Sequence, residues 1–286
     1  MSKALNEPIL IIKTAWGGRS LNTDFRSPSA GPKVFNEYTR NQWKKRGLDA
    51  DQEAAKNNKN DGIFYHHMID HVQKVLKDIK RVVPDYDPKQ GYELAGFVWF
   101  QGFNDLVDSW TYPDQGKPGG YDQYAELLAH FIRDVRKDLA APKLPFVIGV
   151  MGIGGIAEGK KGEQMHFRQA QAAPAALAEF KGNVKVVETA PFWDDDLEAL
   201  QQRMEKCNNK FESEAKKGPK QTREEKDAAK KKAIDQAFTA AELKRFQTGV
   251  SNGGYHYLGA AKILAPIGKA FAEALLPTDP KPAQSR

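Results

Sequence analysis

The chain has 286 residues, 40% of them hydrophobic, which is enough to bury a substantial core in one large domain. Its 43 Lys and Arg against 37 Asp and Glu give a formal net charge of +6, and its single cysteine excludes an internal disulfide. No apolar run is long enough to span a bilayer and no signal peptide begins at Met1, so we expect no membrane partner.

Apolar runs alternate with stretches of helical spacing along the chain. This alternation predicts an α/β fold, a three-layer, flavodoxin-like sandwich with a mostly parallel sheet. In such sheets, ligands bind in the loops that follow the strands. The predicted strands cover residues 8–15, 94–100, 146–151 and 184–189, and the predicted helices cover 63–82, 121–139, 165–179 and 260–276.

A polar segment at about 194–247 is dense in Lys, Glu, Gln and Ala and is interrupted at Gly218-Pro219. This composition predicts a charged helical hairpin inserted into the domain, either as a lid or as a contact with another subunit. Its basic residues alternate with acidic ones and lack aromatic neighbours, so we expect no nucleic-acid partner. The predicted organisation is one domain over 1–276 with this insertion, followed by a disordered tail over 277–286.

The run Trp99-Phe100-Gln101-Gly102-Phe103-Asn104-Asp105 places a polar turn directly after a predicted buried strand. An Asn on such an edge is able to direct its amide N–H at a carbonyl oxygen that becomes negative during acyl transfer, so the run predicts half of an oxyanion hole. Asn and Asp also begin helices and turns for local hydrogen-bonding reasons, and this interpretation stays open.

Two further segments favour a catalytic site. The apolar run 9–16 stops at Gly17 and Gly18, where the backbone is free to approach a ligand and expose its N–H groups. Near the other end of the chain, Gly253-Gly254-Tyr255-His256-Tyr257-Leu258-Gly259 places one His in a loop just before a predicted helix. Most isolated His residues are structural, but a loop position favours function.

In this order, the strand with Trp-Gly-Gly, the Trp-x-Gln-Gly-x-Asn-Asp run and the late His resemble the SGNH hydrolase superfamily. The chain is most similar to the sialate O-acetylesterase-like carbohydrate esterases of that superfamily. The resemblance implies that Gly17 or Gly18 and Asn104 supply oxyanion donors and that His256 is the general base. It also implies hydrolysis of O-acetyl esters on carbohydrates without a cofactor.

The chain departs from the family pattern in two places. A Gly-Asp-Ser or Gly-Gln-Ser block with the nucleophile precedes the Trp-Gly-Gly strand in relatives, whereas only residues 1–7 precede it here. We therefore expect the nucleophile to be missing, and the chain to be part of a longer protein or inactive as it stands. Relatives also carry an Asp three residues before the His, and this position is Gly253 here.

The residue that orients the ring of His256 is therefore open. Asp105 and Asp108 are candidates, whereas the acidic run 194–196 is expected to cap the helix that follows it.

Two serines are alternative nucleophiles. Gly249-Val250-Ser251-Asn252-Gly253 has the spacing of a nucleophile elbow, but a charged helical pattern precedes it where a strand is required. We interpret it as a polar turn that positions the His. Ser20 follows the paired glycines, where a hydroxyl is expected to satisfy the turn.

Three residues beside the predicted site are candidates for substrate binding. Arg19 is able to hold a hydroxyl-rich or acidic group, Gln101 to bond a sugar hydroxyl, and Trp16 to stack on a sugar ring, although each also has a structural interpretation. The pair His67 and His71 has no third ligand beside it, so we expect no metal site.

The hypothesis is a serine–histidine hydrolase whose partner is an acetylated carbohydrate. The alternative is a non-catalytic carbohydrate-binding or interaction module on the same scaffold. The sequence leaves open the oligomeric state and the localisation, although relatives are often exported.

Overall fold

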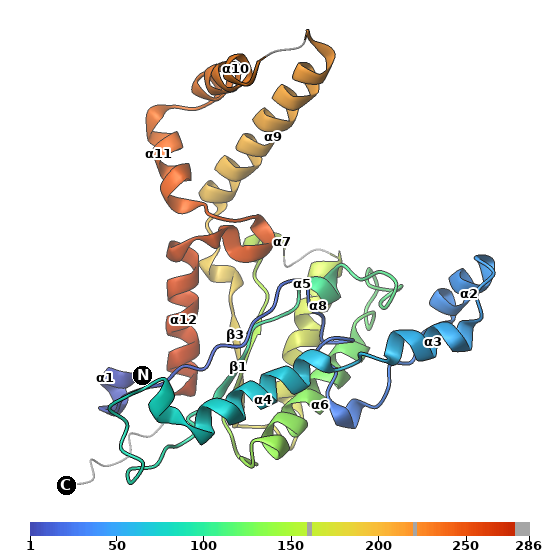
Figure 1. Ribbon diagram of the computed structural model, residues 1–286, viewed down its shortest axis with the longest axis vertical. Helices are drawn as coiled ribbons and strands as arrows, with labels where there is room; N and C mark the ends of the chain where they lie inside the picture. Colours follow the sequence, from blue (N-terminus) through green and yellow to red (C-terminus); the bar gives the residue numbers. More distant parts are fainter. Residues whose placement is uncertain (159–161, 220–221, 278–286) are drawn as a thin grey trace. The chain divides into compact units, whose positions relative to one another are not determined.

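The computed structural model describes residues 1–158, 162–219 and 222–277, so all of the predicted tail except Pro277 lies outside the described residues. The chain divides into two compact units (Figure 1). The first comprises Met1–Met151, Lys160–Glu188 and Lys269–Arg286, and the second comprises Gly152–Gly159 and Thr189–Gly268. The organisation as one domain with an insertion stays a prediction.

The first unit contains the sheet and most of the predicted α/β alternation. Its helices are α1 (Ser2–Leu5), η1 (Pro28–Ala30), α2 (Glu37–Lys45), α3 (Ala50–Asn58), α4 (Ile63–Lys77), η2 (Ile79–Arg81), α5 (Phe103–Leu106), α6 (Asp122–Asp138), α8 (Gly162–Ala172) and η3 (Ala173–Ala176). Its strands are β1 (Phe97–Trp99), β2 (Phe146–Val150) and β3 (Val184–Glu188).

The three strands form one parallel sheet in the order β1-β2-β3. Phe97 pairs with Phe146, which in turn pairs with Val184. All five residues of the central strand β2 are buried, as expected of a parallel strand that is covered on both faces. The predicted α/β fold with a parallel sheet is therefore confirmed.

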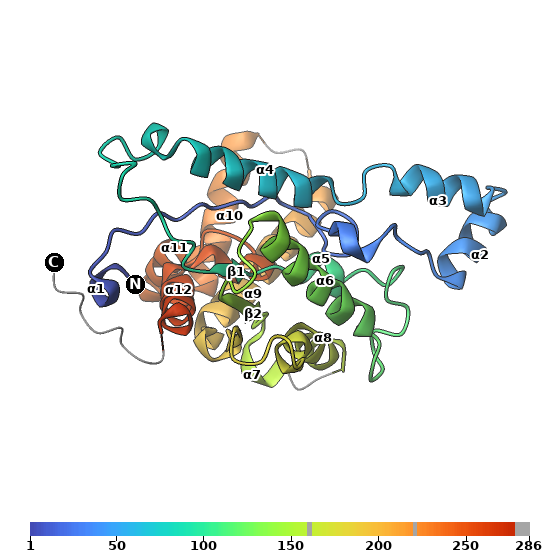
Figure 2. The ribbon, with the colours of Figure 1, turned by 90° about the horizontal axis from the view of Figure 1, so that it is seen from below.

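Helices of the first unit, α6 among them, lie beside this sheet (Figure 2). On one face, the ring of Phe131 in α6 packs on two rings of β1. Its centroid lies 4.3 Å from that of Trp99 and 5.9 Å from that of Phe97. On the other face, a Cβ at Gly149 would lie 2.7 Å from the ring of Phe271, in the last turns of α12 (Ala261–Leu275). The sheet therefore lies between two helical layers within this unit.

The predicted strand at 8–15 is wrong. Residues 8–16 have no regular secondary structure, and Leu10 and Ile11 are 43% and 81% exposed. An apolar run becomes a strand only where a neighbouring strand accepts its backbone hydrogen bonds. The sheet of the described residues offers no such partner to this segment.

The second unit is helical. It contains α7 (Gly155–Glu158), η4 (Ala190–Phe192), α9 (Asp195–Lys217), α10 (Arg223–Ala237), α11 (Ala240–Gly249), η5 (Gly254–Gly259) and the first turns of α12. The predicted hairpin is present, since α9 packs against α10 and ends before Gly218. Asp194 caps α9 by accepting the N–H of Leu197, as the acidic run predicted.

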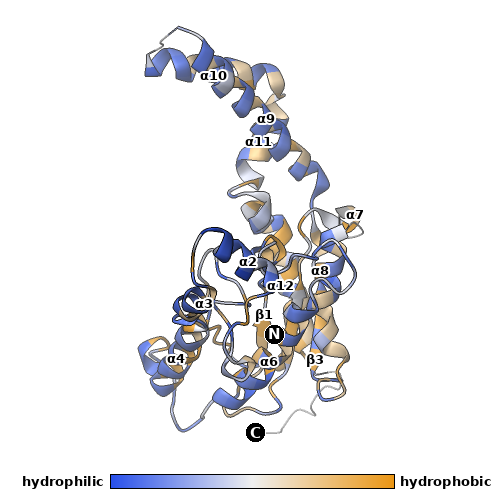
Figure 3. Ribbon diagram, turned by 90° about the vertical axis from the view of Figure 1, so that its right-hand side faces the viewer, coloured by the Kyte–Doolittle hydropathy of each residue, from blue (hydrophilic) through white to orange (hydrophobic). Residues whose placement is uncertain are grey.

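The hairpin is a polar structure, as its composition predicted. In Figure 3, α10 is mostly hydrophilic, and none of its residues is buried. Capping boxes at Thr222 and Thr239 fix the first turns of α10 and α11. Among the described residues, no helix combines the length and the apolar character that a membrane span requires.

Candidate active site

In the first unit, the site is built at the end of β1. The chain leaves the strand through Gly102, where a Cβ would lie 2.7 Å from Nε2 of Gln171 and 2.8 Å from the ring of Phe167, so only glycine fits without a shift. Gln171 is fully buried and joins two strand ends, because it accepts the N–H of Met151 and donates to the carbonyl of Gln101. The turn that begins α5 is therefore fixed to the sheet.

Asn104 is the second residue of α5, the short helix that follows Gly102. Its side chain is partly buried and makes no hydrogen bond to any residue that the structure describes. An amide with unused donors at a fixed strand end is what an oxyanion donor requires.

Asp105 joins this turn to the segment after the paired glycines. Its carboxylate is fully buried and accepts the backbone N–H groups of Leu21 at 2.8 Å and Asn22 at 3.0 Å. It also accepts hydrogen bonds from Nε2 of Gln101 at 2.7 Å and from the hydroxyl of Tyr112 at 3.1 Å. Burial raises the pKa of Asp105 to about 6, against the lowering effect of these hydrogen bonds.

Gly17 and Gly18 come just before the segment that Asp105 holds. Both are exposed, and neither N–H has a hydrogen-bond partner within the described ranges. Gly18 has a φ of 69°, a conformation that favours glycine. The structure thus brings the Gly-Gly segment and the Asn104 turn together in one unit.

The three predicted substrate-binding residues lie beside the junction, by which we mean the hydrogen bonds that join the segment after the paired glycines to the turn with Asn104. Gln101 donates to the carbonyl of Arg19 at 2.9 Å as well as to Asp105. Arg19 pairs with Asp24 at 3.1 Å, and its guanidinium lies 4.1 Å from the centre of the Phe64 ring. Trp16 is 38% exposed and packs edge to face on the same Phe64 ring.

Ser20 has the local role that the sequence predicted. Its hydroxyl donates to Asp24 at 3.2 Å and accepts the N–H of Thr23 at 3.2 Å. These bonds satisfy the turn that follows the paired glycines.

No sequence motif indicates a cavity of about 100 Å³ in the same unit, lined by Lys33 and Trp110 among others. The ammonium of Lys33 donates to the hydroxyls of Thr23 and Thr111, both at 3.1 Å, and burial lowers its pKa. Asp108 also lines this cavity and accepts the N–H and the hydroxyl of Thr111.

His256 belongs to the second unit, in the loop that contains η5. Its Nδ1 lies 3.0 Å from Oδ1 of Asn252, a residue that the sequence did not single out as a partner. Ser251 follows α11 where an elbow requires a strand, and its hydroxyl donates to the carbonyl of Gly259 at 2.9 Å.

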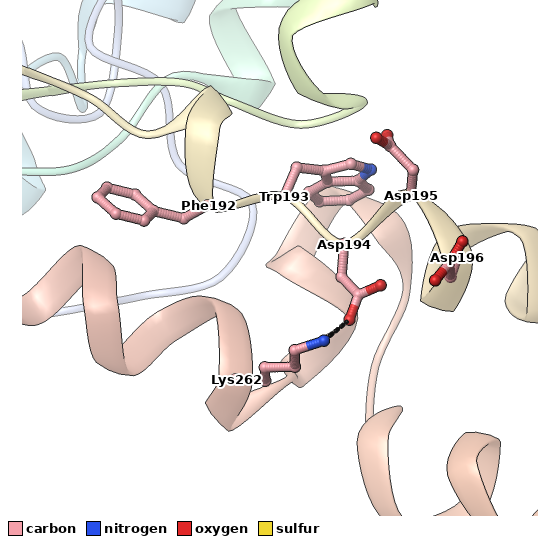
Figure 4. A pocket seen from close by; sticks show the side chains of 6 residues that line it. All are labelled: Phe192, Trp193, Asp194, Asp195, Asp196 and Lys262. Carbon is pink, nitrogen blue, oxygen red and sulfur yellow. Dashed lines mark hydrogen bonds and ion pairs between the residues drawn. The ribbon is translucent and has the colours of Figure 1, made fainter.

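The second unit also contains a cavity of about 270 Å³ (Figure 4). Its acidic lining is largely paired, since Asp194 binds Lys262 at 2.7 Å and Arg245 at 3.0 Å. Trp193, another lining residue, donates its indole N–H to Glu198. No group of three or more His, Cys, Asp or Glu in the described part of the chain is placed to hold a metal ion.

The first unit is thus an α/β unit with a parallel sheet, and an amide side chain, that of Asn104, lies in the short helix that follows β1. Residues 1–218 match the family described as carbohydrate esterase, sialic acid-specific acetylesterase. The chain belongs to this family, which confirms the resemblance and supports carbohydrate acetylesterase activity in general. The match includes Asn104 and the sheet and ends before His256. Searches of curated proteins and of solved structures found no match.

Proposed function

We propose that the site of this chain is that of a hydrolase of O-acetyl esters on carbohydrates that works by a serine–histidine mechanism, with no residue of the chain assigned as the nucleophilic serine. His256 acts as the general base, and Asn104 with the backbone N–H of Gly17 or Gly18 stabilises the oxyanion. The proposal rests most heavily on Asp105, whose carboxylate holds the segment after the paired glycines against the turn that carries Asn104.

The chemistry follows from these roles. A serine hydroxyl attacks the acetyl carbonyl carbon while Nε2 of His256 takes its proton, and the carbonyl oxygen becomes an oxyanion. The intermediate collapses, the C–O bond to the sugar breaks, and the imidazolium returns the proton to the leaving sugar oxygen. Water then attacks the acetyl-enzyme in the same way and releases acetate.

Side chains beside the junction supply the contacts to the sugar. Trp16 offers a partly exposed indole face, Arg19 a partly exposed guanidinium, and Gln101 an amide at the strand end. Aromatic faces and planar donors are well suited to sugar rings and their hydroxyl groups.

The test is the release of acetate from an O-acetylated sialic acid, measured for the wild-type chain and for His256→Ala. A chain that supplies its own serine hydrolyses the ester as wild type and loses about 10²–10⁴-fold of the rate in the variant, the factor that a positioned base supplies. Equal rates would overturn the assignment of His256. A wild type that binds the sugar but releases no acetate would favour the alternative, a non-catalytic carbohydrate-binding module.

A further inference from the structure

The contact between His256 and Asn252 determines which ring nitrogen carries the proton. Oδ1 of Asn252 lies 3.0 Å from Nδ1 of His256 and also accepts the backbone N–H of Gly253 at 2.8 Å. Because a backbone N–H only donates, the second bond fixes the orientation of the amide, with its oxygen towards the ring. The imidazole must therefore donate from Nδ1, which leaves the lone pair of Nε2 to accept a proton.

The loop that holds this pair is folded back on itself in a strained conformation. Tyr257 and Leu258 have φ angles of 54° and 58°, which are uncommon for residues other than glycine. The carbonyl of Leu258 accepts the N–H groups of both Ser251 and Asn252, at 2.8 and 3.0 Å. Such strain persists only where the surroundings over-determine it, and it concentrates at functional sites.

Tyr257 supplies much of that constraint within the second unit. Its side chain is buried, and its hydroxyl accepts the N–H of Gly152 at 2.8 Å and lies 2.8 Å from Oγ1 of Thr189. The backbone on the carboxyl side of His256 is thereby fixed, so Asn252 and His256 face each other across a closed turn.

The same loop disfavours an acid at the position where relatives carry one. A Cβ at Gly253 would lie 2.6 Å from the ring of Tyr255, so a larger side chain there requires this ring to move. The ring of Tyr255 in turn packs edge to face on His256, with centroids 4.5 Å apart.

We propose that Asn252 is the positioning residue of His256, holding the ring with its proton on Nδ1 and with Nε2 available as the base. This inference rests on the proposed function for the catalytic role of His256, but the geometry of the pair does not depend on it. The orienting partner is a neutral amide four residues before the His, in place of a carboxylate three residues before it.

The test is ¹⁵N NMR of the full chain labelled at histidine, recorded where the rings are neutral. His256→Gln assigns the signal of His256 among the six histidines. We expect the Nδ1–H tautomer in the wild type and in Asn252→Asp, which retains the acceptor, and a shift towards the Nε2–H tautomer in Asn252→Ala. Ser251→Ala is the matched control, because it removes another hydrogen bond of this loop without touching the ring.

Two outcomes would overturn the inference. One is an unchanged tautomer in Asn252→Ala, and the other is a loss of the Nδ1–H tautomer in Ser251→Ala as large as in Asn252→Ala, which would make the effect one of loop folding. In acetate release, we expect Asn252→Ala to lower kcat by about 10- to 10²-fold at constant KM, with rescue by Asn252→Asp. A wild type without activity would refute the proposed function, whereas the tautomer measurement would still decide the role of Asn252.

Discussion

The buried carboxylate of Asp105 accepts the backbone N–H of Leu21 at 2.8 Å, although the two residues are 84 positions apart in the sequence. This bond and its neighbour at Asn22 join the two segments on which the oxyanion donors are proposed. Each group that contacts this carboxylate acts as a hydrogen-bond donor.

Asp105→Asn is therefore expected to destabilise the protein. The amide NH₂ group would face a buried donor, and each donor left unpaired costs about 1–3 kcal/mol, so we expect the free energy of unfolding to fall by about 3 kcal/mol. The measurement is urea denaturation at neutral pH. Asp114→Asn, on the surface beside Lys117, is the control and should change stability by less than about 0.5 kcal/mol. Equal stability of the two variants would contradict the role of Asp105.

The raised pKa of Asp105 also predicts a pH dependence. A carboxyl with a pKa of about 6 in the folded state and an ordinary value near 3.8 in the unfolded state binds its proton more tightly when folded. Its contribution to stability is then full below about pH 4 and is lost as the pH rises through about 6. The difference in unfolding free energy between wild type and Asp105→Asn should fall by about 2–3 kcal/mol from pH 4 to pH 7. A constant difference over this range would contradict the assignment.

Gly17 and Gly18 form a matched pair for testing the backbone conformation. Only Gly18 has a positive φ, of 69°, and a Cβ meets no atom within 4 Å at either position. Gly18→Ala should therefore cost about 1 kcal/mol through backbone strain alone, whereas Gly17→Ala should be nearly neutral. Thermal unfolding of the two variants measures this difference, and equal melting temperatures would argue against the turn as described.

Asn104→Ala should lower kcat for acetate release by about 10²–10³-fold with little change in KM, because the lost donor acts mainly in the transition state. The fold should tolerate the change, since this side chain makes no hydrogen bond to the described residues. Asn57→Ala, on the exposed side of α3, is the control. A rise in KM at constant kcat would instead assign Asn104 to ground-state binding of the sugar.

Tyr257→Phe tests the constraint on the His256 loop. Removing the hydroxyl leaves the buried N–H of Gly152 without its partner, which should cost about 1–3 kcal/mol. Amide hydrogen exchange at Gly152 reports this loss locally and should become faster. Tyr92→Phe, at a ring that is 56% exposed, is the control. Unchanged exchange in Tyr257→Phe would show that other contacts fix the loop.

The strands of the sheet could be predicted because their sequence patterns are local. Residues 146–150 are uniformly apolar and are all buried in β2, and β1 and β3 also lie within their predicted ranges. The run at 8–15 contains four branched apolar residues in succession, 9–12, but whether it forms a strand depends on a distant partner, which a local pattern does not contain.

The candidate site was predictable in its residues but not in its contacts. Asn104 and the paired glycines follow from motif order, whereas the bonds of Asp105 to a distant segment do not. For His256, the position three residues earlier, where an orienting acid was expected, is a glycine and supplies no partner. The actual partner, Asn252, reaches the ring only through a turn with positive φ at Tyr257 and Leu258, which a sequence pattern does not reveal. The Ser-Asn-Gly sequence before the His was the available signal, since Asn side chains commonly bond nearby groups in turns.

An activated serine in this chain is tested by labelling the wild type and His256→Ala with a fluorophosphonate, which reacts only with such a serine. A serine–histidine mechanism carried out by this chain itself predicts labelling of the wild type and a strong reduction in the variant, and the labelled peptide then identifies the nucleophile that no sequence motif assigns. Absence of labelling in the wild type, or equal labelling of the two proteins, would contradict a histidine-activated serine in this chain.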